Sequence, residues 1–225
     1  MLNADRNQRF PLQSLAALLL KILADSNLLS VIDKLLPHLL LLAPTSGMYE
    51  VLEHDVRLEL LDTLGREAVY YKRQRVRFLQ DNIVAYEDKA WGDGNIFAKY
   101  KCSPGVPVDY YRDGHRYRVL ISLRETKKRG DVMEFHIQRQ IECGFMQEIE
   151  ELQSEIDHET KELTLTVIFP QERHPKAVWR VKQNAARTTP LESNHFQRLP
   201  DGKLQIRWRT QHPKRFDAYS LRWSW

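Results

Sequence analysis

The sequence predicts a mainly β protein with an N-terminal helical segment, folded as an antiparallel β-sandwich or an open barrel, with an Ig-like sandwich as one form. Apolar residues recur at helical spacing up to residue 47 and mostly alternate with polar residues after it. Aromatic residues make up 10% of the chain, which suits β-strands. We therefore expect a leucine-rich helical segment, 1–47, and a β-rich domain, 48–225. Two packed β subdomains with a break near 145–160 are the alternative to one domain.

Two amphipathic helices are predicted in the N-terminal segment. Pro11 suits a first helical turn, 25–27 offers N-caps for a second helix, and Pro37 ends or kinks that helix. The apolar stripes contain Leu12, Leu15, Leu19, Ile22, Leu28, Ile32 and Leu35. Residues 10–42 carry more apolar surface than a helical hairpin buries by itself. The sequence therefore predicts that they dock a protein partner, a second copy of the chain, or the β-rich domain.

Charged residues argue against a membrane span in this segment. The apolar run is interrupted by Lys21, Asp25, Asp33 and Lys34. The uncharged stretches are shorter than the ~18–20 residues that cross a bilayer. Asp5 and Lys21 also argue against a signal peptide. The chain has two cysteines, Cys102 and Cys143, which we expect to be reduced thiols in the cytoplasm.

Alternating apolar residues predict strands in the β-rich domain, among them 56–60, 163–169 and 204–208. The most regular stretch is the last one, 219–225. Its apolar face consists of Tyr219, Leu221, Trp223 and Trp225. We expect this strand to be tied into a sheet, with its aromatic face in the core. Residues 145–153 are expected to form a helical turn or an acidic loop.

Two turn sequences set the register of two predicted hairpins. Asp-Gly at 113–114 accepts positive φ at both positions, and Leu-Pro-Asp-Gly at 199–202 fits a type I turn followed by a glycine bulge. The resulting pairs are Tyr110 with Tyr117, Asp109 with Arg118 and, in the second hairpin, Phe196 with Ile206. In the first hairpin, the opposite charges of Asp109 and Arg118 would then lie directly across from each other on the paired strands.

Three arginines, Arg73, Arg75 and Arg77, share one face of a predicted strand. Their spacing of about 6.6 Å roughly matches successive phosphates of an extended nucleic acid. A predicted turn could extend this basic patch through Lys127, Lys128 and Arg129. The alternative is a solvated face whose arginines pair with acids on adjacent strands. The candidate acids are Glu53, Asp55 and Glu59.

The search for catalytic motifs finds no glycine-rich phosphate loop, no GxSxG, no HExxH and no CxxC. A lowered thiol pKa beside Lys101 could make Cys102 a nucleophile, but we favour a loop residue. The acidic cluster 155–159, which includes His158, is the best local set of metal ligands, yet a solvated turn is the better interpretation. No catalytic residue, metal or cofactor is predicted.

The charge distribution leaves two interpretations open. Residues 147–162 contain seven acids and one base, whereas 163–225 contain twelve bases and four acids. The asymmetry indicates either a polyanionic partner or two faces of one domain that meet each other. Together these observations favour a non-enzymatic protein-interaction or adaptor module that docks through residues 10–42. The alternatives are a nucleic-acid-binding protein and an enzyme built on a cysteine or on a histidine–carboxylate site.

Overall fold

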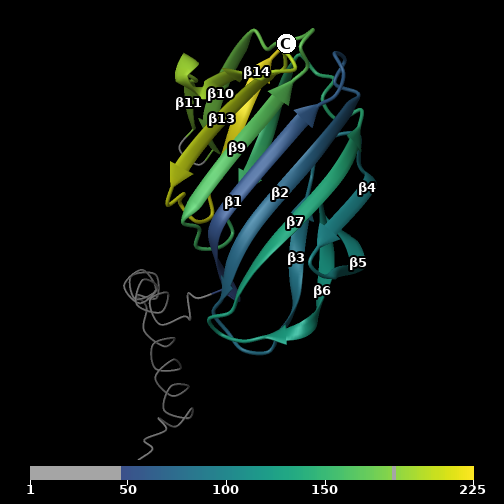
Figure 1. Ribbon diagram of the computed structural model, residues 1–225, viewed down its shortest axis with the longest axis vertical. Coiled ribbons are helices and arrows are strands. Elements are labelled where there is room, and N and C mark those ends of the chain that lie inside the picture. The colour runs from purple at the N-terminus through teal and green to yellow at the C-terminus, as the bar shows by residue number, and fades with distance from the viewer. Residues whose placement is uncertain (1–46, 184–185) are drawn as a thin grey trace, which may run out of the picture. The chain divides into compact units, whose positions relative to one another are not determined.

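The computed structural model describes residues 47–183 and 186–225, which are mainly β, as the sequence predicts (Figure 1). The predicted docking helices of residues 10–42 lie outside the described residues. Within them a short 3₁₀ helix, Ser193–His195, accompanies the strands. The strands are β1 Tyr49–Leu60, β2 Glu67–Phe78, β3 Ile83–Ala90, β4 Asn95–Ser103, β5 Val106–Asp113, β6 Arg116–Lys127, β7 Val132–Glu142, β8 Ile149–Glu155, β9 Glu162–Phe169, β10 Ala177–Lys182, β11 Arg187–Pro190, β12 Phe196–Arg198, β13 Leu204–Gln211 and β14 Ala218–Ser224.

These strands form three sheets in two layers. One layer is a seven-stranded sheet of order β12-β13-β9-β1-β2-β7-β4. A four-stranded sheet, β11-β10-β14-β8, lies behind the upper part of the large sheet in Figure 1, and a three-stranded sheet, β3-β6-β5, behind its lower part. Neighbouring strands are antiparallel except β1 and β9, so the large sheet is mixed. None of the sheets in the described part closes into a barrel.

Each small sheet encloses its own apolar core against the large sheet. We call the cluster around Leu58, Leu165 and Trp223 the Trp223 core; it lies under the four-stranded sheet. The cluster around Phe135 and Tyr86 is the Tyr86 core, under the three-stranded sheet. Strands β1, β2 and β7 contribute to both cores. The β-rich part is therefore one compact unit with two cores.

Two sequence predictions about strands are confirmed at the C-terminal end. Phe196 pairs with Ile206 across the β12–β13 hairpin, as the glycine-bulge turn predicts. Strand β14 lies between β10 and β8. Its predicted apolar face is buried, with Trp223 0% and Trp225 5% exposed. By contrast, residues 145–153 are not a helical turn or an acidic loop throughout, because β8 begins at Ile149.

The β5–β6 hairpin differs from its predicted register by two residues. Tyr110 pairs with Val119 rather than Tyr117, and the loop residues are 114–115. The positive φ of 63° falls on Gly114, the first central position, where a type II′ turn requires glycine. A shift by two keeps side chains on their faces but separates Arg118 from Asp109. Arg118 forms its ion pairs with Asp113 and Glu87 instead.

Among the described residues, no helix has the length or the hydropathy that crossing a bilayer requires. The two cysteines are free thiols: Cys102 is half-buried and Cys143 is exposed.

Candidate functional site

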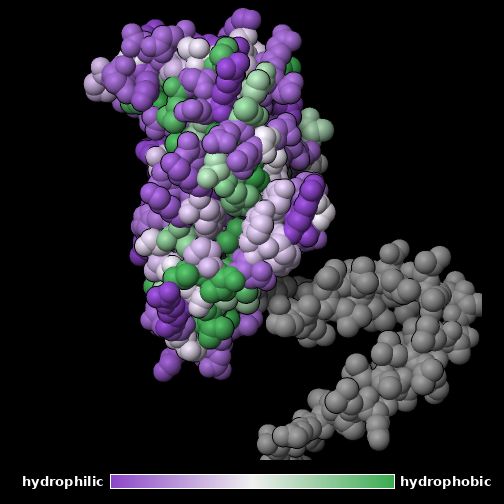
Figure 2. All heavy atoms as spheres, turned by 90° about the vertical axis from the view of Figure 1, so that its right-hand side faces the viewer, coloured by the Kyte–Doolittle hydropathy of each residue, from purple (hydrophilic) through white to green (hydrophobic). Residues whose placement is uncertain are grey.

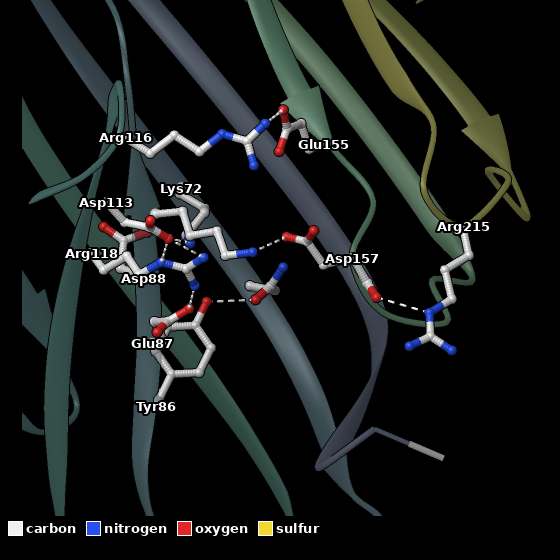
Figure 3. Close-up of polar contacts among 12 residues, drawn as sticks. Lys72, Tyr86, Glu87, Asp88, Asp113, Arg116, Arg118, Glu155, Asp157 and Arg215 are labelled. Carbon is white, nitrogen blue, oxygen red and sulfur yellow. Dashed lines mark hydrogen bonds and ion pairs between the residues drawn. The ribbon is translucent and has the colours of Figure 1, made fainter. Parts of the chain in front are cut away.

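The two small sheets meet at a seam over the large sheet, where residues of the edge strands β3 and β8 line the same cavity. Side chains, rather than backbone hydrogen bonds, cross this seam (Figure 3). The crossing contacts are Lys89 Nζ to Asp157 Oδ2 at 2.9 Å, Trp91 Nε1 to Gln153 Oε1 at 3.1 Å, and an ion pair between Arg116 and Glu155.

A cavity of about 560 Å³, which we call the groove, lies at this seam. Five consecutive residues of β3, 83–87, form one wall, and residues of β8 and the following loop, including Asp157 and His158, form the other. The floor comes from β1 and β2 of the large sheet. A second cavity of about 450 Å³ lies along β8 and shares Trp91 and Gln153 with the groove. The seam is therefore hollow on both sides of its side-chain contacts.

A buried ion pair joins the floor of the groove to β3. Lys72 Nζ of β2 lies 2.5 Å from Asp88 Oδ1, and the Asp88 side chain is fully buried. The hydroxyl of Tyr100 donates to the other carboxylate oxygen at 3.2 Å. Burial alone would lower the pKa of Lys72, but the adjacent Asp88 carboxylate outweighs it and raises the pKa above its ordinary value. Lys72 is therefore a permanently charged group.

Three further polar side chains lie on the inner side of the groove. Tyr86 donates its hydroxyl to Gln74 Oε1 at 2.5 Å. His54 is 8% exposed, and burial together with the Lys72 charge lowers its pKa to about 3. The centroids of the His158 and Tyr49 rings lie 4.1 Å apart, with the ring planes tilted by 31°. His54 Nε2 and His158 Nδ1 have no hydrogen-bond partner among the described residues. The lowered pKa keeps the imidazole of His54 neutral near pH 7.

Sequence reasoning did not select these residues, although a signal was present. It grouped Arg73, Arg75 and Arg77 on one face of β2, and the other face carries Val76 and Phe78, which are buried. Continuing that second face backward reaches Gln74 and Lys72, which are 7% and 8% exposed. Polar residues that fall on the same strand face as buried apolar residues indicate a buried polar site.

The basic patch is brought together but is matched by acids. Arg73 binds Glu53 and Glu134, Arg75 binds Glu53, and Arg77 binds Glu50. The turn 128–131 hydrogen-bonds to Phe78, which places Lys128 and Arg129 beside the end of the stripe. Lys127 pairs with Glu125. Two of the expected acids, Glu53 and Asp55, are within ion-pair distance of Arg73, whereas Glu59 binds Lys203.

The cysteine and acidic-cluster candidates do not gain catalytic geometry. Burial, followed by the charge of Asp88, raises the pKa of Cys102, which speaks against the nucleophile alternative. The favoured interpretation as a loop residue is wrong in one respect, because Cys102 lies within β4. The carboxylates of Glu155 and Asp157 are held by Arg116 and Lys89 (Figure 3). Within 47–183 and 186–225, no His, Cys, Asp and Glu side chains form a group that could hold a metal ion.

Acidic and basic segments of the chain meet in several places. Glu151 of β8 binds Arg222 of β14, and Glu162 of β9 binds Arg209 of β13. These contacts fit the interpretation of two charged faces of one domain.

Comparison with known proteins adds little to this geometry. No protein-family model and no curated protein matches the chain. Among solved structures, it is similar to the crystal structure of Legionella pneumophila aminopeptidase A in complex with aspartic acid, with a TM-score of 0.47 and 14% identity. The match covers 80% of this chain and 22% of the aminopeptidase, so this chain spans about a fifth of that protein's length.

Proposed function

We propose that this chain is a non-enzymatic protein-interaction module of the cytoplasm, with the β unit as its scaffold and the seam as a contact surface. The groove carries this proposal, because one of its walls is a strand edge rather than a closed surface of side chains. Two of its lining residues, Met48 and Val84, are 44% and 57% exposed. Exposed apolar side chains beside an open strand edge are the features through which β proteins bind other chains.

The charges of the groove support binding rather than catalysis. Its ionised groups already form ion pairs, Lys72 with Asp88, Glu87 with Arg118, Lys89 with Asp157, and Glu155 with Arg116. A general acid or base must change its protonation state near neutral pH. Lys72 remains charged and His54 remains neutral in that range. These groups are therefore suited to shape and polarity, not to proton transfer.

The surface on the side of β4, β5 and β6 is mostly hydrophilic, and apolar side chains gather toward its lower part (Figure 2). Exposed apolar residues of the described chain include Val108, Tyr110 and Tyr111 of β5. A protein-interaction module needs such surface, since interface centres are depleted of charge. Residues 10–42, which the sequence predicts as a docking segment, would add to it.

Cross-linking of the full chain in an extract of its native host tests the proposal. We expect a protein partner that saturates, that excess unlabelled chain displaces, and that nuclease treatment leaves in place. Recovery of no saturable partner would contradict the proposal. Complexes that disappear with nuclease would also contradict it and would favour the nucleic-acid alternative.

A further inference from the structure

Five of the six edge strands in the described sheets carry features that oppose pairing with another chain. Natural sheets protect edges with short strands, prolines, bulges and charges. The protected edges are β12 with three residues, β11 ending at Pro190, β8 with Glu150, Glu151 and Glu155, β4 with a register shift between Asn95 and Lys99, and β5 with Pro107 and a register shift. Each of these five edge strands therefore has at least one feature that opposes pairing with another chain.

The first half of β3 has neither charge nor proline. Residues 83–86 read Ile-Val-Ala-Tyr, and in the described chain β3 pairs with β6 alone. Its register shift, between Ile83 and Ala85, places the extra residues in β6, where Arg124 has a φ of 58°. From Ala85 onward the pairing with β6 is regular. Strand β3 therefore presents an even and unprotected edge.

This edge faces the groove. Successive side chains of a strand point to opposite faces, so a cavity that lies against one face contacts alternate residues. All five residues of 83–87 line the groove, which places the cavity along the backbone edge of β3, and Leu120 of β6 shows that it also extends over one face of that sheet. In an antiparallel pair the two residues of a hydrogen-bonded pair point their N–H and C=O groups at each other, and intervening residues point theirs outward. The outward groups of β3 are thus directed toward the groove.

We infer that the groove binds an extended, uncharged segment of a partner protein, which adds to β3 as a further strand opposite residues 83–87. This inference rests on the proposed protein-interaction function. The occupant is uncharged because the ionised groups of the groove are already matched in pairs. The contact of Lys89 with Asp157 crosses the seam just beyond residue 87 and limits the added strand to about five paired residues.

The two sides of the groove predict what the segment presents at alternate positions. On the inner side, polar side chains that include Gln74, His54 and Ser154 line the groove, so small hydroxyl or amide side chains suit this side. On the outer side, Met48 and Val84 are exposed and suit apolar side chains. A segment that alternates serine, threonine or asparagine with valine, isoleucine or leucine satisfies both sides.

A random peptide-display library, panned against the full chain, provides the probe. We expect enrichment of uncharged, alternating sequences, and synthetic peptides of these sequences are then titrated by fluorescence anisotropy. Val84→Lys places a charge on the exposed edge and should weaken binding at least tenfold. Val132→Lys is the control, because Val132 is an exposed valine, 44%, in β7 of the large sheet and outside the groove lining, and should bind like the parent. Two peptide series are N-methylated at alternate nitrogens, one at odd and one at even positions. Only the series whose methylated nitrogens face β3 should lose binding.

The two variants must melt within a few degrees of the parent, and Val84→Thr, an uncharged substitution, should retain binding. Enriched peptides that bind the parent and Val84→Lys equally, or a library that yields no enrichment, would overturn the inference. Self-association of the chain that Val84→Lys removes would also overturn it, because the occupant would then be a second copy. If cross-linking finds a protein partner that Val84→Lys still binds, strand addition fails while the proposed function stands.

Discussion

The two cores lie on the same large sheet but are built differently. The Trp223 core is an apolar cluster in which Phe169, Trp223 and Trp225 pack edge to face. The Tyr86 core is equally apolar at its centre, yet a buried ion pair, Lys72 with Asp88, lies at its border with the groove. Buried ion pairs contribute little net stability, because desolvation offsets their attraction. The two halves therefore differ at the groove: aromatic packing dominates the Trp223 core, whereas the Tyr86 core ends at a buried charged pair beside the groove.

The largest expected effect is on the Trp223 core. Removing residues 223–225 takes away two buried tryptophans, each worth about 3–5 kcal/mol as a truncation to alanine. This approaches a typical total stability of about 5–15 kcal/mol. We expect the shortened chain to be unfolded or aggregated, as judged by expression and thermal melting. A melting temperature within a few degrees of the full chain would contradict the assignment of these residues to the core.

The next effect concerns the ion pair at the Tyr86 core. Asp88→Ala leaves the buried ammonium of Lys72 without a counter-charge, which should cost about 3–5 kcal/mol in urea unfolding at neutral pH. Replacing both residues, Lys72→Met with Asp88→Leu, should recover most of that loss, since no buried charge is left. A double variant as unstable as Asp88→Ala would show that the pair stabilises through specific geometry.

A smaller effect appears as a dependence on pH. The pKa of His54 is about 3 when folded, against an ordinary value near 6.5, so the unfolded chain binds the extra proton. The contribution of the neutral His54 to the free energy of unfolding is fully present above pH ~6.5. It is lost as the pH falls toward 3, by at most about 1.4 kcal/mol per pH unit. His54→Leu should flatten this part of the stability curve, measured by urea unfolding between pH 4 and 7.

The smallest effect is expected on the outer face of the large sheet, where Arg75 pairs with Glu53. Exposed ion pairs contribute about 0–1 kcal/mol, so Arg75→Gln should change stability within that range. Because the arginines are matched by acids, we expect weak retention on heparin even at about 50 mM salt. Strong retention that reversal of Arg73, Arg75 and Arg77 to glutamate abolishes would favour the nucleic-acid alternative instead.

Strand faces were predictable from the sequence, but one hairpin register was not. The alternation at 56–60 follows from burial of one face, so it appears in the residues themselves. Strand β9 also alternates but is buried on both faces, with Thr164 and Thr166 on the second one. The turn at 113–114 was misplaced by one position because Asp and Gly both tolerate positive φ, and only Gly114 adopts it. Strand β5 is mostly exposed, so burial adds little to specify its register.

The candidate site was not predictable by motif. Lys72 and Asp88 are separated by sixteen positions and meet only because β2 and β3 lie in different layers. No local spacing of residues in the sequence indicates the contact between Lys72 and Asp88. The protected and unprotected edge strands can be recognised in the sequence only once the strand order is known. In a central strand the same residues would say nothing about pairing with another chain.

The way the cores are distributed along the chain also affects how the protein is made. The buried residues of the Tyr86 core all lie between 49 and 137, whereas the Trp223 core requires β14. Chains are synthesised from the N-terminus at about 5–20 residues per second, and domains fold as they emerge. The Tyr86 core therefore has its full set of residues first. Until β14 leaves the ribosome, the apolar face of β1 around Leu58 has nothing to cover it, and the nascent chain is a natural client for chaperones during that interval.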